Sequence, residues 1–484
     1  MSDQAKLSDL LLGACETFGA ATACEAALET TSYAALSMQA RAIADELHRA
    51  DLRPEEPVLV PVSNQASDIA AFIATWLAGG VAVPVHRSTP AAAMELTRVR
   101  TKARLLADAS AELPVRQIAE TVPPARAILA GAALVIFTSG STGQPKGVVL
   151  SHRAFTGKLN AIDSLLRFSR CTRSLVVLQI TFSFGIWVSL LTLVKGGVLL
   201  MHPRFDGEAT LTALASQGAT DAAFVPTMLR QFLRLDLSTV LSLGKRGLCR
   251  IITGGEPLGR ELSQQISAFF PKIEIADIYG LTETCTSDFI LMPDEQQSHR
   301  GCIGRPTPGV SFRIADNQGR DVSMNEIGEL QIHTPFVMNG YLDQPELTKA
   351  AFCGEFLRTG DLARLRPDGM VELVGRSKEL IMRGGTKVSP LELDELLASH
   401  PAVAAALTVG VPDPVMGERI HALIVLREHQ KLEESALRQW VSERVEKFKR
   451  PDAYHFGSSL PTGRTGKVDR GALREQIGRM ADSA

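Results

Sequence analysis

The stretch at residues 138–148 reads TSGSTGQPKGV and directly follows the apolar run AALVIF at residues 132–137. It combines glycines, hydroxyl donors and one embedded positive charge in Thr138, Ser139, Gly140, Ser141, Thr142, Gly143 and Lys146. Glycine lets the backbone bend and approach a ligand closely, while hydroxyl and ammonium groups donate to anions. The composition is therefore typical of a loop that wraps a polyphosphate.

This stretch differs from the common P-loop, which reads G-x-x-x-x-G-K-[ST]. Gln144 and Pro145 follow Gly143, and Lys146 precedes a glycine instead of a hydroxyl residue. The alternative is a flexible Ser/Gly surface loop. The preceding run, which has the character of a buried strand, and the embedded lysine favour the phosphate loop.

Length and composition indicate a globular protein of about three domains or subdomains. The 484 residues are 45% hydrophobic, and 51 basic against 53 acidic side chains give a net charge of −2, which does not favour a nucleic-acid partner. The seven cysteines form no C-x-x-C pair, which predicts reduced thiols and no metal cluster.

One uncharged stretch, Ile69–Val85, is considered as a candidate membrane span; it is rich in alanine and glycine and contains Pro84. It predicts a buried helix, turn and strand instead of a membrane helix. The first residues lack the basic and apolar regions of a signal peptide. We therefore expect a cytoplasmic protein without membrane insertion.

Short apolar runs alternate with helical patterns through the first 300 residues. The runs are PVLVPV (57–62), VAVPV (81–85), SLVVLQI (174–180), GVLLM (197–201), AAFVP (222–226), RIITGG (250–255) and IADIYG (275–280). This alternation predicts parallel sheets covered by helices, with ligands at the carboxyl ends of the strands. The ends TSGSTG, TGGEPLG and YGLTET are therefore expected to converge on one site.

Beyond residue 300 the pattern changes to short alternating segments such as FRIADNQGR, GELQIH and GMVELVGR, which predict hairpins of a smaller β-rich region. A boundary follows at 375–378. Ser389, Pro390 and Glu392 mark a helix start with a capping box, and residues 435–448 predict another helix. The last hundred residues therefore form a small α+β domain.

Taken in order, the motifs resemble those of the ANL adenylating enzymes, the superfamily of acyl-CoA synthetases, peptide-synthetase adenylation domains and luciferases. The matching segments cover nearly the whole chain: 31–40, 76–85, 138–148, 253–259, 279–284, 328–352, 358–361, 375–390 and 460–470. The resemblance implies an α/β fold with a large N-terminal domain (1–377) of parallel-type sheets with helices plus a small β-rich subdomain. A smaller, mobile α+β C-terminal domain (378–484) would follow.

Members of this family join a carboxylic acid to ATP, release pyrophosphate, and pass the acyl group from AMP to a thiol. By resemblance, residues 138–146 would hold the β- and γ-phosphates, Thr282 would donate to the α-phosphate, and Glu283 would hold Mg²⁺. Tyr279 would lie against adenine, with Gly254, Gly255 and Glu256 along its other edge. Asp361 would accept from the ribose hydroxyls, with Arg376 nearby.

The C-terminal domain would supply the remaining parts. Lys467 would bridge the substrate carboxylate and the α-phosphate, and Lys378 would be the hinge about which the domain turns between the two half-reactions. Gly384 and Gly385 would flank the channel for the thiol arm. The segment 378–397 resembles CoA ligases, and the chain ends without a carrier domain; these points favour coenzyme A, with carrier-protein phosphopantetheine as the alternative.

The segment TFSFGIW at residues 181–187 indicates which class of carboxylic acid the enzyme would bind. Amino-acid-activating members carry an aspartate where Gly185 stands, which argues against an α-amino acid. Phe182, Phe184, Ile186 and Trp187 suggest an apolar pocket for a fatty or aromatic acid, with plain core packing as the alternative for each. The segment lacks the histidine of many CoA ligases, so Phe182 or Phe184 would cover the site instead.

Three other functions remain as alternatives. The chain could load an acid onto a separate carrier protein, oxidise its adenylate as luciferases do, or bind nucleotide without catalysis. The last would predict the loss of Lys146, Glu283, Asp361 or Lys467, and all four are present.

Overall fold

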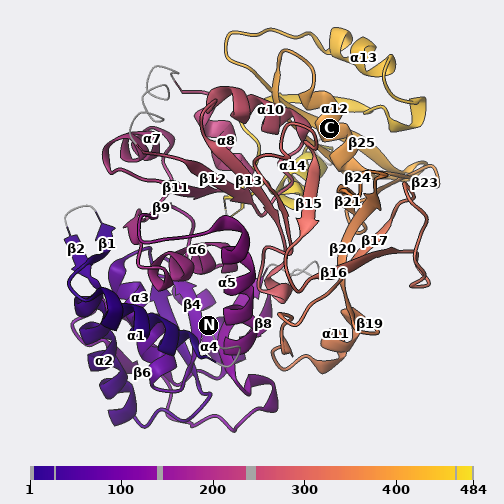
Figure 1. Ribbon diagram of the computed structural model, residues 1–484. Helices are drawn as coiled ribbons and strands as arrows, with labels where there is room; N and C mark the ends of the chain where they lie inside the picture. The colour runs from indigo at the N-terminus through magenta and orange to yellow at the C-terminus, as the bar shows by residue number, and fades with distance from the viewer. Residues whose placement is uncertain (1–4, 27–28, 139–144, 236–246, 464–465, 482–484) are drawn as a thin grey trace.

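The computed structural model describes residues 5–26, 29–138, 145–235, 247–463 and 466–481. The chain runs from an N-terminal region with two sheets to a smaller C-terminal region with its own sheet, drawn in orange and yellow at the upper right of Figure 1. The predicted α/β class with a large N-terminal and a smaller C-terminal part is confirmed.

A seven-stranded sheet occupies one side of the N-terminal region. In spatial order its strands are β18 (Gly340–Tyr341), β8 (Lys146–Ser151), β7 (Ala132–Thr138), β4 (Val81–His86), β3 (Pro57–Val62), β5 (Leu105–Ala107) and β6 (Val115–Gln117). The strands β7, β4, β3 and β5 pair in parallel, and every residue of β3 is buried, as its uninterrupted apolar sequence predicts. β7 and β8 pair antiparallel, with Thr138 opposite Lys146.

The second sheet has 14 strands. Its order is β16 (Ser311–Ala315), β17 (Gly328–His333), β20 (Phe356–Leu365), β21 (Val371–Arg376), β15 (Cys302–Pro306), β14 (Phe289–Leu291), β13 (Glu274–Tyr279), β12 (Arg250–Gly254), β11 (Asp221–Phe224), β9 (Arg173–Val176), β10 (Val198–Met201), β1 (Thr22–Ala26) and β2 (Glu29–Ser32), with β19 (Phe352–Cys353) beside β20. The strands from β13 to β1 are parallel, and those from β13 to β16 are antiparallel. The β-rich region expected as a separate subdomain therefore continues the parallel sheet.

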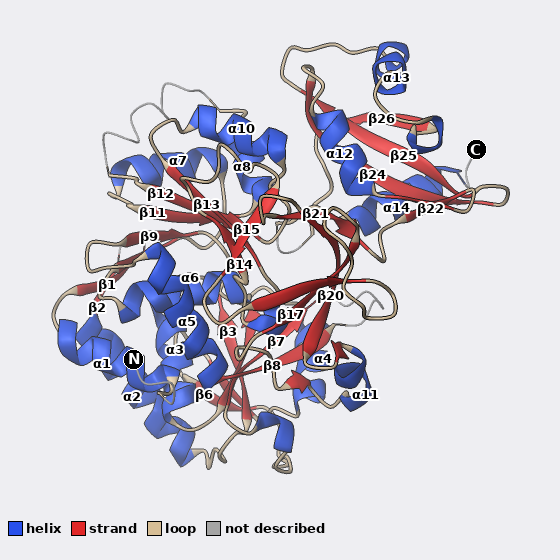
Figure 2. Ribbon diagram, turned by 45° about the vertical axis from the view of Figure 1, so that its right-hand side comes forward, coloured by secondary structure: helices blue, strands red, loops and turns tan. Residues whose placement is uncertain are grey.

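Helices cover these sheets, as Figure 2 shows in blue. They are α1 (Leu7–Phe18), α2 (Tyr33–Arg49), α3 (Ala66–Leu77), α4 (Ala91–Thr101), α5 (His152–Leu166), α6 (Ser183–Val194), α7 (Gly207–Ser216), α8 (Pro226–Phe232), α10 (Arg260–Phe269) and α11 (Pro345–Ala350), with the 3₁₀ turns η1 (Ala127–Leu129) and η3 (Thr282–Thr284). Helix α3 contacts strands of both sheets, α5 contacts the first and α6 the second. Their side chains join both sheets in one continuous core.

The C-terminal region has a five-stranded sheet of β23 (Thr386–Val388), β22 (Ile381–Arg383), β25 (Gly417–Leu426), β24 (Val403–Asp413) and β26 (Ala453–Gly457). Helices α12 (Pro390–Ala398), α13 (Glu434–Ser442) and α14 (Arg470–Ala481) and the turn η4 (Lys447–Lys449) accompany it. Helix α13 ends six residues before the predicted end at residue 448, and the Arg450 guanidinium donates to the carbonyls of Ser442 and Val445 beyond it.

The predicted capping box of α12 is only half formed. Ser389 accepts from the Glu392 amide at 3.3 Å, and Pro390 stands at the first helical position. The Glu392 carboxylate instead accepts from Lys449 at 2.7 Å, so an ion pair to a distant turn takes the place of the local bond.

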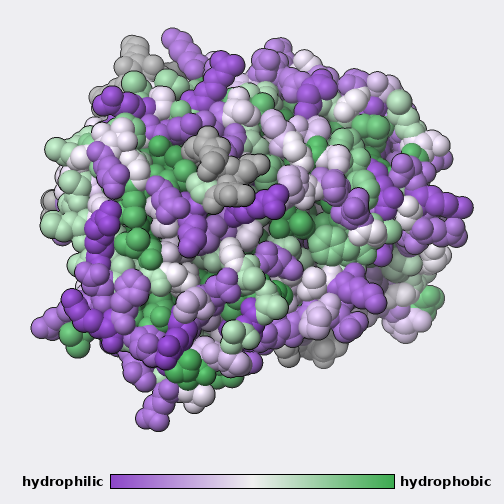
Figure 3. Space-filling model, turned by 60° about the horizontal axis from the view of Figure 1, so that its bottom comes forward, coloured by the Kyte–Doolittle hydropathy of each residue, from purple (hydrophilic) through white to green (hydrophobic). Residues whose placement is uncertain are grey.

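The surface and the cysteines agree with the composition. Figure 3 shows hydrophilic and hydrophobic residues interspersed on the face it presents. All seven cysteines are free thiols. None of the helices within the described ranges has the length and apolar character needed to cross a bilayer.

Candidate functional site

A cavity of about 1720 Å³ lies where the two N-terminal sheets and the C-terminal region meet. Its walls come from the loop after β4 and helix α4, the ends of β7, β12 and β13, helix α8, strands β20 and β21, helix α12 and the loop before α14. The ends of three predicted site strands therefore converge on it, as parallel-sheet topology requires. Lys467 reaches the same cavity from the far end of the chain.

The predicted phosphate loop is described only at its two ends. Ser139, Gly140, Ser141, Thr142 and Gly143 lie outside the described residues. Thr138 ends β7 and lines the cavity, and Lys146 begins β8. The Lys146 ammonium lies 5.0 Å from the centre of the Tyr341 ring, within the range of a cation–π contact.

Tyr341 connects this lysine to the predicted metal ligand. Its hydroxyl donates to Glu283 Oε1 at 2.9 Å, and the Met338 amide donates to the Glu283 carbonyl at 2.7 Å. Burial and the neighbouring Glu283 raise the pKa of Tyr341 far above its usual range, so it remains a donor. Sequence reasoning missed Tyr341, although a tyrosine inside the matched segment 328–352 was the available signal.

Thr282 and Glu283 lie on η3 and are held by an unusual backbone segment. Cys285, Thr286 and Ser287 follow with φ of 57°, 73° and 47°, a conformation that side chains other than glycine rarely adopt in succession. A Cβ on Gly280 would overlap the Ser287 amide, which explains the glycine of YGLTET. The turn is thus fixed by tight backbone packing.

A buried ion pair supports this segment from below. Lys158 Nζ, on α5, contacts Asp288 Oδ1 at 2.8 Å, and both side chains are at most 1% exposed. The Thr284 hydroxyl donates to the other carboxylate oxygen. Burial raises the pKa of Asp288, and the contacts with Lys158 and Thr284 oppose this. Because Thr284 belongs to η3, the pair anchors the turn that carries Thr282 and Glu283.

Asp361, Tyr279 and Arg376 form one hydrogen-bonded group. Asp361 Oδ2 accepts from the Tyr279 hydroxyl at 2.6 Å, and Oδ1 accepts from Arg376 Nε at 2.8 Å. Asp361 and Arg376 are direct partners in the β20–β21 ladder, which brings them together. Burial is the larger cause that raises the pKa of Tyr279, and the neighbouring Asp361 raises it further. The same carboxylate raises the pKa of Arg376.

The turn after β12 places Gly254, Gly255 and Glu256. A Cβ on Gly254 would overlap Ile278 of the next strand, and Gly255 has a φ of 85°. The Glu256 carboxylate accepts from the Thr227 hydroxyl at 2.9 Å and from the Val468 amide. Glu256 is predicted to lie along the adenine edge, and in this structure its carboxylate contacts the loop of Lys467.

Lys467 lies against this turn. A Cβ added to Gly255 would stand 3.0 Å from the Lys467 ammonium nitrogen. Burial lowers the pKa of Lys467, Glu256 opposes this and Arg376 adds to it. The lysine is therefore half-buried beside the same cavity as Asp361 and Tyr279.

The predicted acid pocket is only partly supported. Phe182 lines the cavity, but Ile186 and Trp187 are 1% and 0% exposed and belong to the core. Phe184 stacks on Trp187 with ring centres 5.8 Å apart, and Gly185 is buried where a Cβ would lie 2.6 Å from the Gln179 carbonyl oxygen. The expectation that Gly185, Ile186 and Trp187 face the acid is thus corrected, because they are buried at the start of α6, and Phe184 is half-buried and does not line the cavity.

Lys378 lies at the cavity, whereas Gly384 and Gly385 are not part of its lining. Lys378 is exposed in the turn between β21 and β22 and lines the cavity. Gly384 and Gly385, with φ of 55° and 80°, form the tip of the β22–β23 hairpin, and the Gly384 amide donates to the Met416 carbonyl at 2.7 Å. They do not line the cavity in this arrangement.

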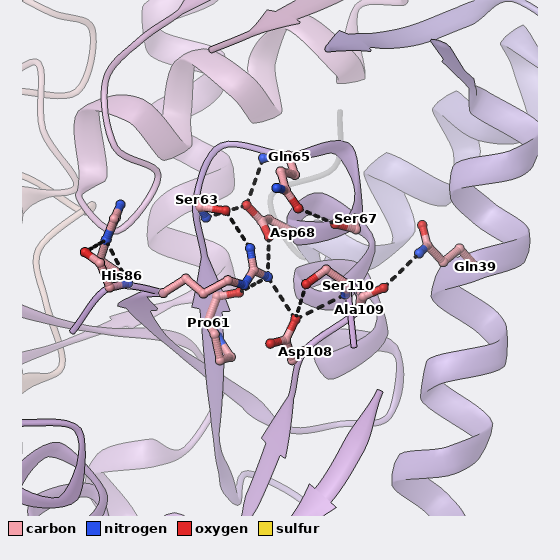
Figure 4. Close-up of polar contacts among 12 residues, drawn as sticks. Gln39, Pro61, Ser63, Gln65, Ser67, Asp68, His86, Asp108, Ala109 and Ser110 are labelled. Atoms are coloured by element: carbon pink, nitrogen blue, oxygen red, sulfur yellow. Dashed lines mark hydrogen bonds and ion pairs between the residues drawn. The ribbon is translucent and has the colours of Figure 1, made fainter. Parts of the chain in front are cut away.

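A charged network that the sequence reading missed holds one wall of the cavity. Arg87 follows β4 and contacts Asp68 at 3.1 Å and Asp108 at 2.8 Å, and Asp68 also accepts from the Ser63 amide at 2.7 Å (Figure 4). Burial raises the pKa of Asp68, and its hydrogen bonds and Arg87 oppose this. The network fixes the segment from His86 to Pro90 along the cavity. The sequence feature that could have predicted this network is that Arg87 and Asp108 each directly follow a parallel strand.

The donor set around Glu283 suits Mg²⁺. Among the described residues, no three or more His, Cys, Asp or Glu side chains gather into a metal cage. Mg²⁺ favours one or two carboxylates together with water and substrate phosphates, so a single glutamate beside a phosphate loop fits it.

Comparison with known proteins assigns both parts of the chain to adenylate-binding enzyme families. Residues 13–342 match the family described as AMP-binding enzyme, and residues 392–467 match the AMP-binding enzyme C-terminal domain. Sulfoacetate–CoA ligase of Cupriavidus necator is 35% identical over 340 residues, which are 70% of this chain and 66% of that protein. Feruloyl-CoA synthase of an Amycolatopsis species is 29% identical over 92% of this chain and 94% of its own length.

Among solved structures, ATP-bound MatB from Rhodopseudomonas palustris superimposes with a TM-score of 0.86 at 25% identity. The superposition covers 98% of this chain and 99% of the MatB chain.

Proposed function

This chain belongs to the AMP-binding enzyme family and is an AMP-forming acid–CoA ligase, and from that premise we propose that it activates a fatty or aromatic carboxylic acid and not an α-amino acid. The observation that supports the adenylation step is the placement of Lys467 against the Gly255 turn, beside the cavity that Asp361 and Tyr279 also line, and the acid class rests on the apolar part of the cavity wall.

In the first half-reaction a carboxylate oxygen attacks the α-phosphorus of ATP, and the bond to pyrophosphate breaks. Two anions meet in this step, so cations fixed around the developing charge lower its barrier. We assign Lys467 to the carboxylate and α-phosphate, Thr282 to the α-phosphate, and Lys146 with Thr138 to the leaving phosphates. Lys467 is half-buried, and a charge in such a position interacts more strongly with these anions than one in bulk water.

Asp361, Tyr279 and Arg376 would hold the nucleoside. The Asp361 carboxylate can exchange its bond with Tyr279 or Arg376 for the ribose hydroxyls, and Gly254 and Gly255 leave room beside the base. Glu283 would hold Mg²⁺, which when bound neutralises phosphate charge.

In the second half-reaction the sulfur of coenzyme A attacks the acyl carbon, and AMP leaves. We propose that residues 378–484 form the mobile domain, that it turns about Lys378, and that Gly384 and Gly385 then flank the thiol arm. Support comes from the place of Lys378, in the turn between the last strand of the 14-stranded sheet and the first strand of the C-terminal sheet.

An apolar acid is supported by the cavity wall. Phe182, Phe137, Val85 and Ile278 line it together with Pro84. A carboxylic acid with a hydrocarbon chain or ring would bury these surfaces, whereas the α-ammonium of an amino acid would need a carboxylate partner there.

The experiment measures pyrophosphate release with a panel of fatty, aryl, dicarboxylic and amino acids, with and without coenzyme A. We expect release with at least one fatty or aryl acid and thioester formation when coenzyme A is added. A phosphopantetheinylated carrier protein forms a parallel arm. Acylation of the carrier but not of coenzyme A would identify a loading enzyme, and release with an amino acid alone would overturn the acid class.

A further inference from the structure

We propose that Glu256 is a positioning residue that docks the loop of Lys467 and keeps that lysine's positive charge at the reacting atoms. The inference rests on the proposed role of Lys467 in adenylation. It adds a function for a residue that the sequence placed beside adenine.

The Glu256 carboxylate is shared by the two parts of the chain. From the N-terminal region the Thr227 hydroxyl donates to Oε2 at 2.9 Å and approaches Oε1 at 3.2 Å, and Arg230 lies 3.8 Å away. From the C-terminal region the Val468 amide donates to Oε1. Helix α8 thus holds the carboxylate in place, and the carboxylate holds the residue after Lys467.

The described residues on the two sides of the loop are bonded to each other, so fixing Val468 also restrains Lys467. Thr462 and Val468 form an isolated antiparallel bridge, the Gly463 amide donates to the Lys467 carbonyl at 2.8 Å, and the Asp469 amide donates to the Pro461 carbonyl at 2.9 Å. A bond at Val468 therefore sets the position of the neighbouring ammonium.

The loop of Lys467 lies in contact with the protein surface beneath it. A Cβ on Gly466 would lie 3.6 Å from Met228, and a Cβ on Gly255 would lie 2.9 Å from Lys467 Cε. The loop therefore rests on the first turn of α8 and on the Gly255 turn. Glu256 supplies the charge-assisted hydrogen bond at this contact, and such bonds are stronger than neutral ones.

Charge is the second part of the role. Glu256 is the anion that favours the protonated form of Lys467 against burial and Arg376. The other charged groups along the cavity around the loop are Arg230 on α8, Asp361 on β20, Asp394 on α12, Glu379 in the turn after β21, and Asp469 and Arg470 beside the loop. Asp361 is bonded to Arg376, Asp394 and Glu379 are bonded to Arg470, and Asp469 accepts from the Ala472 amide, whereas Glu256 accepts from the amide of the residue after Lys467.

Two substitutions separate docking from charge. Glu256→Gln keeps an oxygen that accepts from Val468 and Thr227 but removes the negative charge, whereas Glu256→Ala removes both. Glu274→Gln is the matched control, because Glu274 is an exposed carboxylate at the start of the adjacent strand β13.

Docking is measured first without any substrate, by hydrogen exchange of the peptide that covers residues 460–470. We expect exchange about tenfold to a hundredfold faster in Glu256→Ala and near the wild-type rate in Glu256→Gln and Glu274→Gln. Unchanged exchange in Glu256→Ala would overturn the docking role, whether or not an acid substrate has been found.

Charge is measured with an acid that the wild type adenylates, as the pH dependence of pyrophosphate exchange. In Glu256→Gln the alkaline limb should move to lower pH by about one unit, because the lysine loses its proton more readily. Thioester formation from supplied acyl-adenylate should be spared in both Glu256 variants. An unmoved alkaline limb would overturn the charge role, and equal loss of both half-reactions would show a general structural defect. Absence of activity in the wild type would instead count against the proposed function.

Discussion

Lys467 is the residue on which the proposed chemistry depends most. We predict that Lys467→Ala lowers acyl-adenylate formation by about a hundredfold or more, because the cation that bridges the two reacting anions is removed. Thioester formation from supplied adenylate should remain near the wild-type rate. The two half-reactions are measured separately by pyrophosphate exchange and by thioester yield.

Lys467→Arg provides the comparison. It keeps the positive charge but not the compact ammonium, so we expect partial activity. A uniform loss of both half-reactions in Lys467→Ala would contradict the assignment.

The buried pair Lys158–Asp288 gives a prediction on stability. Lys158→Met leaves Asp288 without its cation in an environment without solvent contact, and should lower the free energy of unfolding by about 3–5 kcal/mol. The double variant Lys158→Met/Asp288→Asn should lose less than the two single variants together, because no unpaired charge remains. Urea unfolding measures all three.

Strict additivity in that comparison would mean that the two side chains do not interact. We also expect the KM for ATP to rise in the single variants, since Thr284 shares Asp288 with the turn of Thr282 and Glu283.

The role of a residue was predictable from the sequence where a motif requires a particular backbone conformation or close packing. Gly280 and Gly254 are glycines because a side chain would overlap the next strand or turn. Partners were not predictable where they depend on contacts across the chain: Tyr341 with Glu283, and Val468 with Glu256, are 58 and 212 residues apart. Apolar residues such as Trp187 were misassigned because an aromatic cluster in sequence has the same composition in a core and in a pocket.

At the scale of elements, helix α12 has a pH-sensitive contact with the start of α10. Glu395 Oε1 lies 3.2 Å from the position of a Cβ on Gly259, and burial, with Glu372 and Asp394, raises the pKa of Glu395 from 4.5 to about 7, while Arg260 opposes this. The folded state therefore binds the proton more tightly than the unfolded state. This contribution is full below about pH 4.5 and is lost as the pH rises to about 7.

We predict that stability of the wild type falls relative to Glu395→Gln between pH 5 and 8, by about 1–2 kcal/mol, reduced from the full shift because the side chain retains solvent contact. Thermal unfolding of both proteins across this range measures the difference. Parallel pH profiles would show that Glu395 does not titrate between the two states.

The elements themselves were largely predictable. The apolar runs predicted strands β3, β4 and β9 to β13 correctly, because strands that are buried on both faces need uninterrupted apolar sequence. Ser389 and Pro390 placed the start of α12 within one residue. The end of α13 was predicted too late, because apolar spacing continues past Ser442 while the chain turns toward η4.

At the scale of the whole molecule, the turn with Lys378 joins two sheets that share no strand pairs. We predict that Lys378→Pro slows thioester formation at least about tenfold and leaves adenylate formation within about twofold, because proline fixes φ where the domain would rotate. Single-turnover measurement of each step tests this, with Lys378→Ala as the variant that removes the side chain but not the backbone freedom.

Unchanged thioester turnover in Lys378→Pro would place the hinge elsewhere. Equal slowing in Lys378→Ala would mean that the side chain, and not backbone rotation, matters at this position.

Fold class and the sequence of domains could be predicted because the motifs occur in order along the chain. The continuity of the 14-stranded sheet could not, since the pairing of β13 with β14 changes the sheet from parallel to antiparallel without any break in sequence pattern. Sheet order depends on long-range pairing, which local patterns do not encode.

The antiparallel pairing of β7 with β8 has a consequence for the order in which products leave. In sites where a phosphate loop runs into a helix, the helix macrodipole adds about half a positive charge that cannot move. Here the chain continues as a strand from Lys146, opposite Thr138, so the attraction comes from a flexible side chain instead. A flexible ammonium can follow a departing anion out of the site. Pyrophosphate should therefore dissociate before the thiol arrives, which clears the site for the second half-reaction.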